Sequence, residues 1–187
     1  LYEESTNIEL PQTFRDDLER IYASAQHLDG LIRDVLDLAQ TELGQLRLSW
    51  DTIDLSEVVR LSALVGEQLV REKDLNWHAD IATEPVFVRG DRTRLQQVIL
   101  NLLHNAVKFT QQGTISLSVA VQENLVTVFV RDTGLGIDQE EQAVIFNEFR
   151  RSERAESGGY GGLGIGLTIS KRIITLHGGD IHVHSSG

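Results

Sequence analysis

The sequence contains no cysteine and no methionine, only two prolines, and no long apolar run. Without cysteine the chain can form no disulfide, no iron–sulfur cluster and no cysteine-ligated zinc site. A membrane-spanning helix needs about 20 consecutive apolar residues, so we expect no membrane contact by this chain. Because it begins with Leu1 and lacks methionine, we expect it to be a piece of a longer protein.

Cationic residues are also scarce, since 17 Lys and Arg stand against 28 Asp and Glu and the formal net charge is −11. A field of that sign repels nucleic acid, and no basic run offsets it, so we exclude nucleic acid as a partner. A phosphate-bearing ligand would have to be bound by local groups, namely backbone N–H groups, a metal ion or a few cationic side chains at the site.

The first part of the chain is predicted to form one long helix over about residues 11–44, with Pro11 in its first turn and Gly44 at its end. Its apolar residues alternate at spacings of four and three: Phe14, Leu18, Ile21, Ala25, Leu28, Ile32, Val35 and Ala39. Such a seam is typical of coiled coils, and a helix of ~34 residues is about 50 Å long. We therefore favour a bundle with a second copy of the chain. The alternative is a helix that lies on its own domain.

After Gly44 the pattern changes to shorter helices and strands. We expect strands at about 46–50, 75–81, 85–88, 114–121, 125–131 and 180–184, and helices at about 54–71, 91–108, 139–146 and 163–177. A polar, glycine-rich loop is expected over 147–162. The absence of strict βαβ alternation favours an α+β fold, a two-layer α/β sandwich with helices on one face of a mixed sheet.

Glycines cluster in front of the last predicted helix, where six of the sixteen fall between Gly158 and Gly166. Glycines let backbone N–H groups approach an anion, and a helix N-terminus attracts one. The spacing Gly159-x-Gly161-x-x-Gly164 matches a dinucleotide fingerprint, but no strand precedes it, which excludes that interpretation. A flexible surface loop is the alternative to a phosphate-binding one.

A second candidate segment, Arg131–Ile137, follows a predicted strand. An ionised carboxylate only accepts hydrogen bonds, so a buried Asp132 could accept from the amine of adenine, whereas guanine presents a carbonyl there. Gly134 and Gly136 would allow a tight turn against the base. The alternative is an ordinary Asp-Gly turn.

A third candidate is the helix expected at 91–108, on which Asn101, Asn105 and Lys108 share one face. Amide oxygens suit Mg²⁺, and a lysine one turn further on can neutralise phosphate charge. A solvated polar face is the alternative.

In their order along the chain, these segments resemble the motifs of the Bergerat-type ATP-binding domain, and more narrowly those of sensor histidine kinases. The matching segments are Asn101–Thr110 (N box), Asp132–Ile137 (first glycine box), Ile145–Phe149 (F box), Gly162–Leu167 (second glycine box) and Leu176–Gly179. The stretches Leu31–Leu38 and Glu42–Gly44 are similar to the second helix of the family's dimerisation and histidine-phosphotransfer domain.

The resemblance implies two parts, a truncated second helix of that domain in residues 1–44 and an ATP-binding catalytic domain in residues 45–187. It also implies a homodimer formed through the N-terminal helix, a response-regulator receiver domain as partner, and a cytoplasmic location, with a parent protein that can be membrane-tethered. The implied activity is transfer of the γ-phosphoryl group of ATP to a histidine and then to a regulator aspartate.

The resemblance further implies a site for ATP and Mg²⁺. Asp132 would contact the adenine amine, Asn105 would ligate Mg²⁺, and Asn101 and Lys108 would be catalytic residues facing the phosphates. Phe109 would lie near the nucleoside, and residues 147–162 would form a mobile lid. The other candidate nucleotide contacts are Gly134, Gly136, Ile137, Arg150, Arg151, Arg154, Tyr160, Gly162, Leu163, Gly164, Ile165, Gly166, Leu167 and Thr168.

The chain departs from the family pattern in its acceptor. The expected histidine followed by an acidic residue and a proline is absent, and His27, the only histidine on the long helix, has no proline after it. We therefore expect the acceptor histidine to lie outside this chain. We also expect slow hydrolysis, because Asn101 stands where gyrase and chaperone relatives have a glutamate base, and an amide cannot take up a proton.

Three alternatives remain open. The first is a stand-alone ATPase or a protein-serine kinase of the same fold, and the second is a non-catalytic dimerisation or docking module. The third is a metal site formed by His177, His182 and His184, which strand alternation explains equally well.

Overall fold

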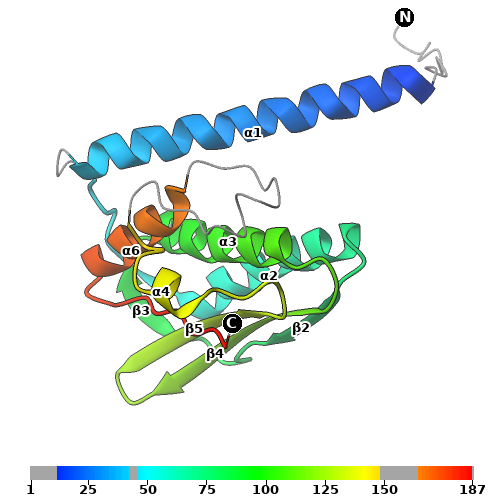
Figure 1. Ribbon diagram of the computed structural model, residues 1–187. Coiled ribbons are helices and arrows are strands. Elements are labelled where there is room, and N and C mark those ends of the chain that lie inside the picture. The colour runs from blue at the N-terminus through cyan, green and yellow to red at the C-terminus, as the bar shows by residue number, and fades with distance from the viewer. Residues whose placement is uncertain (1–11, 43–45, 148–163, 187) are drawn as a thin grey trace, which may run out of the picture.

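The computed structural model describes residues 12–42, 46–147 and 164–186. Its helices lie on one face of a mixed sheet, and one long helix crosses the outer side of the helical layer (Figure 1). The elements are α1 Gln12–Glu42, β1 Asp51–Asp54, α2 Leu55–Glu72, β2 Asn76–Asp80, β3 Phe87–Gly90, α3 Arg92–Phe109, β4 Thr114–Gln122, β5 Leu125–Asp132, α4 Gln139–Gln142 and α6 Gly166–Leu176. The predicted α+β sandwich with a long N-terminal helix is confirmed.

The main sheet has the order β2-β4-β5, with β2 parallel and β5 antiparallel to the central strand β4. Along β4 the side chains alternate, so Ile115 and Leu117 are fully buried while their neighbours are only partly covered. β1 and β3 form a separate antiparallel pair. The mixed sheet that the sequence predicts is therefore present.

Two apolar clusters hold the helices in place. The larger lies between α2, α3 and the sheet and includes Val58, Val59 and Leu103 together with the buried residues of β4. The smaller joins α6 to α3 and to the segment before β1; its buried members are Leu46, Val98, Ile165, Ile169 and Ile173. Because α3 belongs to both clusters, it is the element from which the rest of the domain is positioned.

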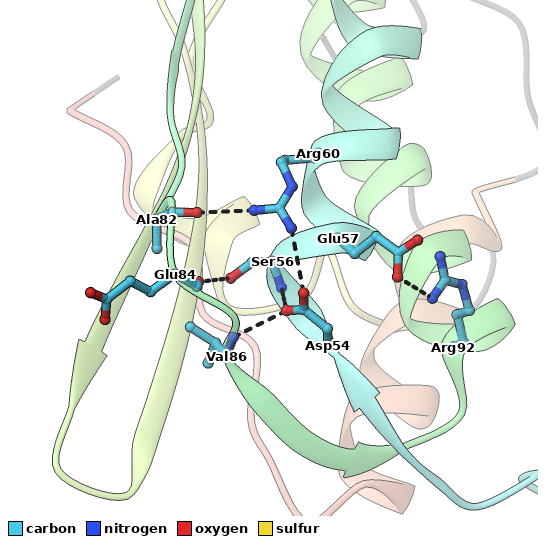
Figure 2. Close-up of polar contacts among 8 residues, drawn as sticks. All are labelled: Asp54, Ser56, Glu57, Arg60, Ala82, Glu84, Val86 and Arg92. Carbon is cyan, nitrogen blue, oxygen red and sulfur yellow. Dashed lines mark hydrogen bonds and ion pairs between the residues drawn. The ribbon is translucent and has the colours of Figure 1, made fainter.

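A polar network fixes the start of α2 (Figure 2). The Oδ1 atom of Asp54, the N-cap residue, accepts hydrogen bonds from the backbone N–H groups of Ser56 at 3.0 Å and Val86 at 3.0 Å. Arg60 donates to Asp54 Oδ2 at 3.4 Å and to the carbonyl oxygen of Ala82 at 3.2 Å. One carboxylate therefore ties the helix start to the loop before β3.

We expect Asp54→Ala to lower the free energy of unfolding by about 1–2 kcal/mol, because it removes the cap and leaves the Val86 N–H group without its acceptor. Urea unfolding followed by circular dichroism measures this change. Asp54→Asn keeps an acceptor oxygen and should be milder. Equal losses for the two variants would contradict the capping role.

Two predicted strands are wrong. The segment 46–50 is not a strand, because Leu46 is buried against α6 and the Ser49 N–H group donates to Asp91 Oδ2 at 2.8 Å. The segment 180–184 is not a strand either, since side chains take two of the backbone N–H groups there. Ile181 N–H donates to the adjacent Asp180 Oδ1, and Ser185 N–H donates to Oε1 of the distant Gln142. In both places alternation in the sequence reflects anchoring by particular side chains rather than a sheet ladder.

The apolar seam of α1 is exposed in this chain. Ile21 is 64% and Leu28 58% exposed, and Phe14, Leu18, Ile32 and Val35 are also exposed. The seam is therefore not covered by the chain's own domain, which argues against the alternative of a helix lying on it with this face. Among the helices of the described ranges, none is both long and apolar enough to span a bilayer.

Candidate functional site

The helix α3 is anchored at both ends. At its start the N-cap Asp91 accepts from the Arg94 N–H group through Oδ1 and from the Ser49 N–H group through Oδ2. At its end the Lys73 ammonium donates to the carbonyl oxygen of Val107 at 2.8 Å, which satisfies a carbonyl of the last turn. The side chains between these ends are therefore presented from a rigid support.

One candidate residue of α3, Asn101, lies directly against α6. Its Nδ2 atom donates to the Ser170 hydroxyl at 2.9 Å. A Cβ added to Gly166 would lie 2.5 Å from Asn101 Oδ1, so any other residue at the first position of α6 would push the Asn101 carboxamide aside. The N box and the second glycine segment are therefore in contact.

The other end of α3 lies against the first glycine segment. The Leu135 N–H group donates to the carbonyl oxygen of Phe109 at 3.2 Å, and a Cβ on Gly134 would lie 2.5 Å from that oxygen. The Gly134 N–H group donates to Asp132 Oδ1 at 2.9 Å. Within the described part of the chain, no hydrogen bond occupies Asp132 Oδ2, and the side chain is exposed. One carboxylate oxygen thus shapes the turn and the other is available to a ligand.

A pocket of about 330 Å³ opens beside this turn. It is lined by Phe109, Gln111, Gln112, Thr133, Gly134 and Leu135. Neither Asn105 nor Gly164 lines it, so it corresponds to the part of the proposed site next to the first glycine segment alone.

The polar residues near the end of α3 have different surroundings. The Lys108 ammonium lies 5.0 Å from the centroid of the Phe109 ring, a cation–π contact. Asn105 is partly buried, and no described residue forms a hydrogen bond with its carboxamide. Its oxygen therefore remains available to a hard cation such as Mg²⁺.

The remaining candidate residues differ in their surroundings. Gly136 and Gly164 have φ values of 70° and 71°, a left-handed conformation that favours glycine. The Ile165 side chain is buried in the smaller apolar cluster, so of this residue only the backbone can face a ligand. The Thr168 hydroxyl is buried without a hydrogen-bond partner in the described part of α6 and its surroundings. Of the others, Arg150, Arg151, Arg154, Tyr160, Gly162 and Leu163 lie outside the described residues.

A second, larger pocket of about 460 Å³ lies elsewhere. Its lining comes from Ser49, β1, the starts of α2 and α3, and Phe87 of β3. Here Arg92 donates a hydrogen bond to Glu57 at 2.9 Å, which lowers the pKa of that carboxyl below its ordinary value. The stabilisation from this pair is therefore present at neutral pH and is lost as the pH falls through the lowered pKa. This pocket contains none of the candidate nucleotide contacts.

Sequence reasoning did not anticipate a partly buried ion pair between α1 and α3. Both carboxylate oxygens of Asp37 accept from Arg94, at 2.8 and 2.7 Å, and Gln97 donates to Asp37 at 2.7 Å. Asp37 is 8% exposed, although the other α1 side chains whose exposure the structure describes are exposed. No local pattern could reveal this, because 57 positions separate the two charged residues.

The histidines near the C-terminus do not form the alternative metal site. Both ring nitrogens of His177 are used within the domain, since Nε2 accepts from the Asp91 N–H group at 2.9 Å and Nδ1 lies 2.8 Å from the Ile173 carbonyl oxygen. His182 is exposed and lies 3.4 Å from Asp180. Across the ranges that the structure describes, no group of three acidic, histidine or cysteine residues could hold a metal ion.

Comparison with known proteins gives matches to one family. The model of the "Histidine kinase-, DNA gyrase B-, and HSP90-like ATPase" family matches residues 90–187, more than half of the chain. The circadian input-output histidine kinase CikA of Synechococcus elongatus is 37% identical over 95% of this chain and 24% of its own length. The histidine-protein kinase BarA of Escherichia coli K12 is 39% identical over 95% of this chain and 20% of its own length.

Solved structures agree with these relatives. The histidine kinase AdeS of Acinetobacter baumannii superposes with a TM-score of 0.71 at 25% identity, covering 91% of this chain and 78% of that one. Full-length ShkA in complex with AMPPNP gives a TM-score of 0.68 at 30% identity, covering 90% of this chain and 35% of that one. The chain thus spans about a quarter or less of the curated relatives CikA and BarA.

Proposed function

Because the chain belongs to the histidine kinase-, DNA gyrase B- and HSP90-like ATPase family, we propose that it is the ATP-binding catalytic core of a sensor histidine kinase. Residues 45–187 are then the ATP-binding domain, and residues 1–44 come from the second helix of the dimerisation and phosphotransfer domain. The parent protein moves the γ-phosphoryl group of ATP to one of its own histidines and then to an aspartate of a response-regulator receiver domain. Relatives named as histidine kinases support this assignment.

One observation carries the proposal: α3 touches both glycine segments, Gly166 through Asn101 and Gly134 through Phe109. A purine and a triphosphate lie several ångströms apart in one nucleotide, so a single helix that reaches both segments can hold both ends. The ShkA neighbour also supports it, because that structure is a complex of a related fold with AMPPNP, an ATP analogue.

The proposed roles of Asp132 and Asn105 follow from the side-chain oxygen atoms that no described residue occupies. Asp132 accepts from the adenine amine through Oδ2, because Oδ1 is already bonded to the Gly134 N–H group. Asn105 offers its carboxamide oxygen to Mg²⁺, which neutralises phosphate charge when bound. Lys108 adds a positive charge beside the phosphates, and the backbone N–H groups at the start of α6 favour an anion.

Hydrolysis of ATP by this site should be slow. A water molecule attacks the γ-phosphate efficiently only when a base accepts its proton, and Asn101 has no basic atom. Catalysis then depends on positioning and on charge neutralisation. The γ-phosphoryl group stays on ATP until the imidazole of the acceptor histidine lies in line with the bond that breaks. This separates the proposal from its two alternatives of the same fold. In a stand-alone ATPase the γ-phosphoryl group passes to water, and in a serine kinase it passes to a serine hydroxyl.

Dimerisation through α1 is part of the proposal. The exposed apolar seam of that helix supports it, since Phe14, Leu18, Ile21 and Leu28 lie uncovered on one chain. Exposed apolar surface of this extent is typical of a helix that packs against a partner helix.

We expect Mg–ADP at 100 times its Kd to raise the free energy of unfolding by about 2.7 kcal/mol, because it binds only the folded chain. Thermal unfolding with and without Mg–ADP measures the effect, with Mg–GDP as the control nucleotide. Unchanged stability would favour the non-catalytic docking module. Rapid steady hydrolysis of ATP would favour the ATPase alternative.

A further inference from the structure

The amino group of the Asn101 carboxamide is committed to a buried hydroxyl. Its Nδ2 atom lies 2.9 Å from Oγ of Ser170, and Ser170 is only 1% exposed. A buried polar group must find its partner inside the protein, because water does not reach it. The buried Ser170 oxygen therefore has its donor across the contact between α3 and α6.

The oxygen of the same carboxamide faces the first residue of α6. A Cβ on Gly166 would lie 2.5 Å from Oδ1 but 3.2 Å from Nδ2, so the oxygen is the atom nearest to that turn. A carboxamide is planar, and its two ends differ in presenting an acceptor or two donors. In this structure the nitrogen is bonded to Ser170, so the end that faces the turn is the oxygen, an acceptor.

We propose that Ser170 is a positioning residue for the nucleotide site. Its hydroxyl accepts from the Asn101 amino group and holds the carboxamide against α6 in the observed orientation, with the oxygen facing the N-terminal turn of α6. The functional importance of this orientation rests on the proposed function, in which that turn binds phosphate. An acceptor there attracts a cation or the hydrogen atoms of water and leaves the phosphate oxygens to the backbone N–H groups of α6. If the Asn101 carboxamide rotated by 180°, its amino group would face the turn and would compete with the backbone N–H groups of α6 for the phosphate oxygens.

A double-mutant cycle tests whether Ser170 acts through Asn101. Calorimetric titration with Mg–ADP should give about tenfold weaker binding for Ser170→Ala, because one buried hydrogen bond and the orientation that it fixes are lost. In an Asn101→Ala background the same substitution should change the affinity less than about twofold. An equal loss in both backgrounds, or no loss in either, would overturn the proposal.

A matched control is available on α2. Ser62 is also fully buried, and its hydroxyl donates to the Val58 carbonyl oxygen at 2.9 Å, away from α6. Ser62→Ala removes a comparable hydroxyl and should leave the Mg–ADP affinity within about twofold of the parent chain. A tenfold loss for Ser62→Ala as well would mean that buried serines act only through general stability, and it would refute a specific role of Ser170.

A spectroscopic measurement on the unmodified chain keeps the proposal separate from the proposed function. Nuclear Overhauser effects should connect the side-chain amino protons of Asn101 with the β-protons of Ser170 without any nucleotide. Amino-proton effects that are stronger to the α-protons of Gly166 than to the β-protons of Ser170 would show the opposite orientation and overturn the proposal. If the chain bound no Mg–ADP but kept the expected contacts, the proposed function would fail while the orientation stood.

Discussion

Asp132→Asn should weaken the binding of Mg–ADP about 10- to 100-fold, since hydrogen bonds to a charged group contribute about 1.5–3 kcal/mol. The substituted amide can still accept from the Gly134 N–H group through its oxygen, so the turn is preserved. Its nitrogen then replaces Oδ2, and a donor faces the adenine amine, which is also a donor. Isothermal titration calorimetry measures the loss.

The matched control for this variant is Asp80→Asn. Asp80 ends β2 as Asp132 ends β5, and both side chains are exposed. The control should bind Mg–ADP like the unmodified chain. Parental affinity in Asp132→Asn would remove Asp132 from the site, and equal losses in both variants would point to a general effect of charge.

Asn105→Ala should abolish most of the dependence of nucleotide affinity on Mg²⁺. The proposed site has a single protein ligand for the ion, and Mg²⁺ is otherwise held by phosphate and water, so removing that ligand leaves nothing on the chain to favour the complexed nucleotide. We expect the ratio of the ADP affinities with and without Mg²⁺ to fall by about tenfold or more. Titration with ADP at a series of Mg²⁺ concentrations measures it.

His104→Ala provides the control, because His104 is the exposed neighbour of Asn105 on the same helix. It should keep the Mg²⁺ dependence of the parent chain. An Asn105→Ala variant with an unaltered Mg²⁺ titration would exclude Asn105 as the ligand.

Local sequence patterns were sufficient for the central helices and the β4–β5 hairpin. Asp54 and Asp91 both cap the helices that follow them, and a capping side chain acts within three residues of itself. The hairpin runs from Thr114 to Asp132, close to the predicted limits, because alternation and a short turn are local properties.

Patterns failed where the outcome depended on distant partners. The segment 46–50 alternates like a strand, yet Leu46 packs into the smaller apolar cluster and the Ser49 N–H group donates to Asp91, the N-cap residue of α3. A strand needs a free sheet edge beside it, and no short window of sequence records whether one is available. The Asp37–Arg94 pair likewise depends on where the fold brings α1, which the heptad seam does not specify.

The same limit applies to the candidate site. The structure brings together the segments that the motifs single out, Asn101 with Gly166 and Phe109 with Gly134. The motifs did not indicate that the Ile165 side chain belongs to the core or that Ser170 holds Asn101. Those facts depend on which face of α6 is turned toward α3. Packing of the smaller apolar cluster determines that orientation.

Mapping of backbone amide chemical shifts during titration with Mg–ADP tests the central claim most directly. We expect the largest shifts at Asn105, at Gly134 and across Gly164–Thr168, because the nucleotide would contact both glycine segments from α3. Shifts confined to the larger pocket, around Asp51, Glu57 and Arg92, would contradict the proposed nucleotide site.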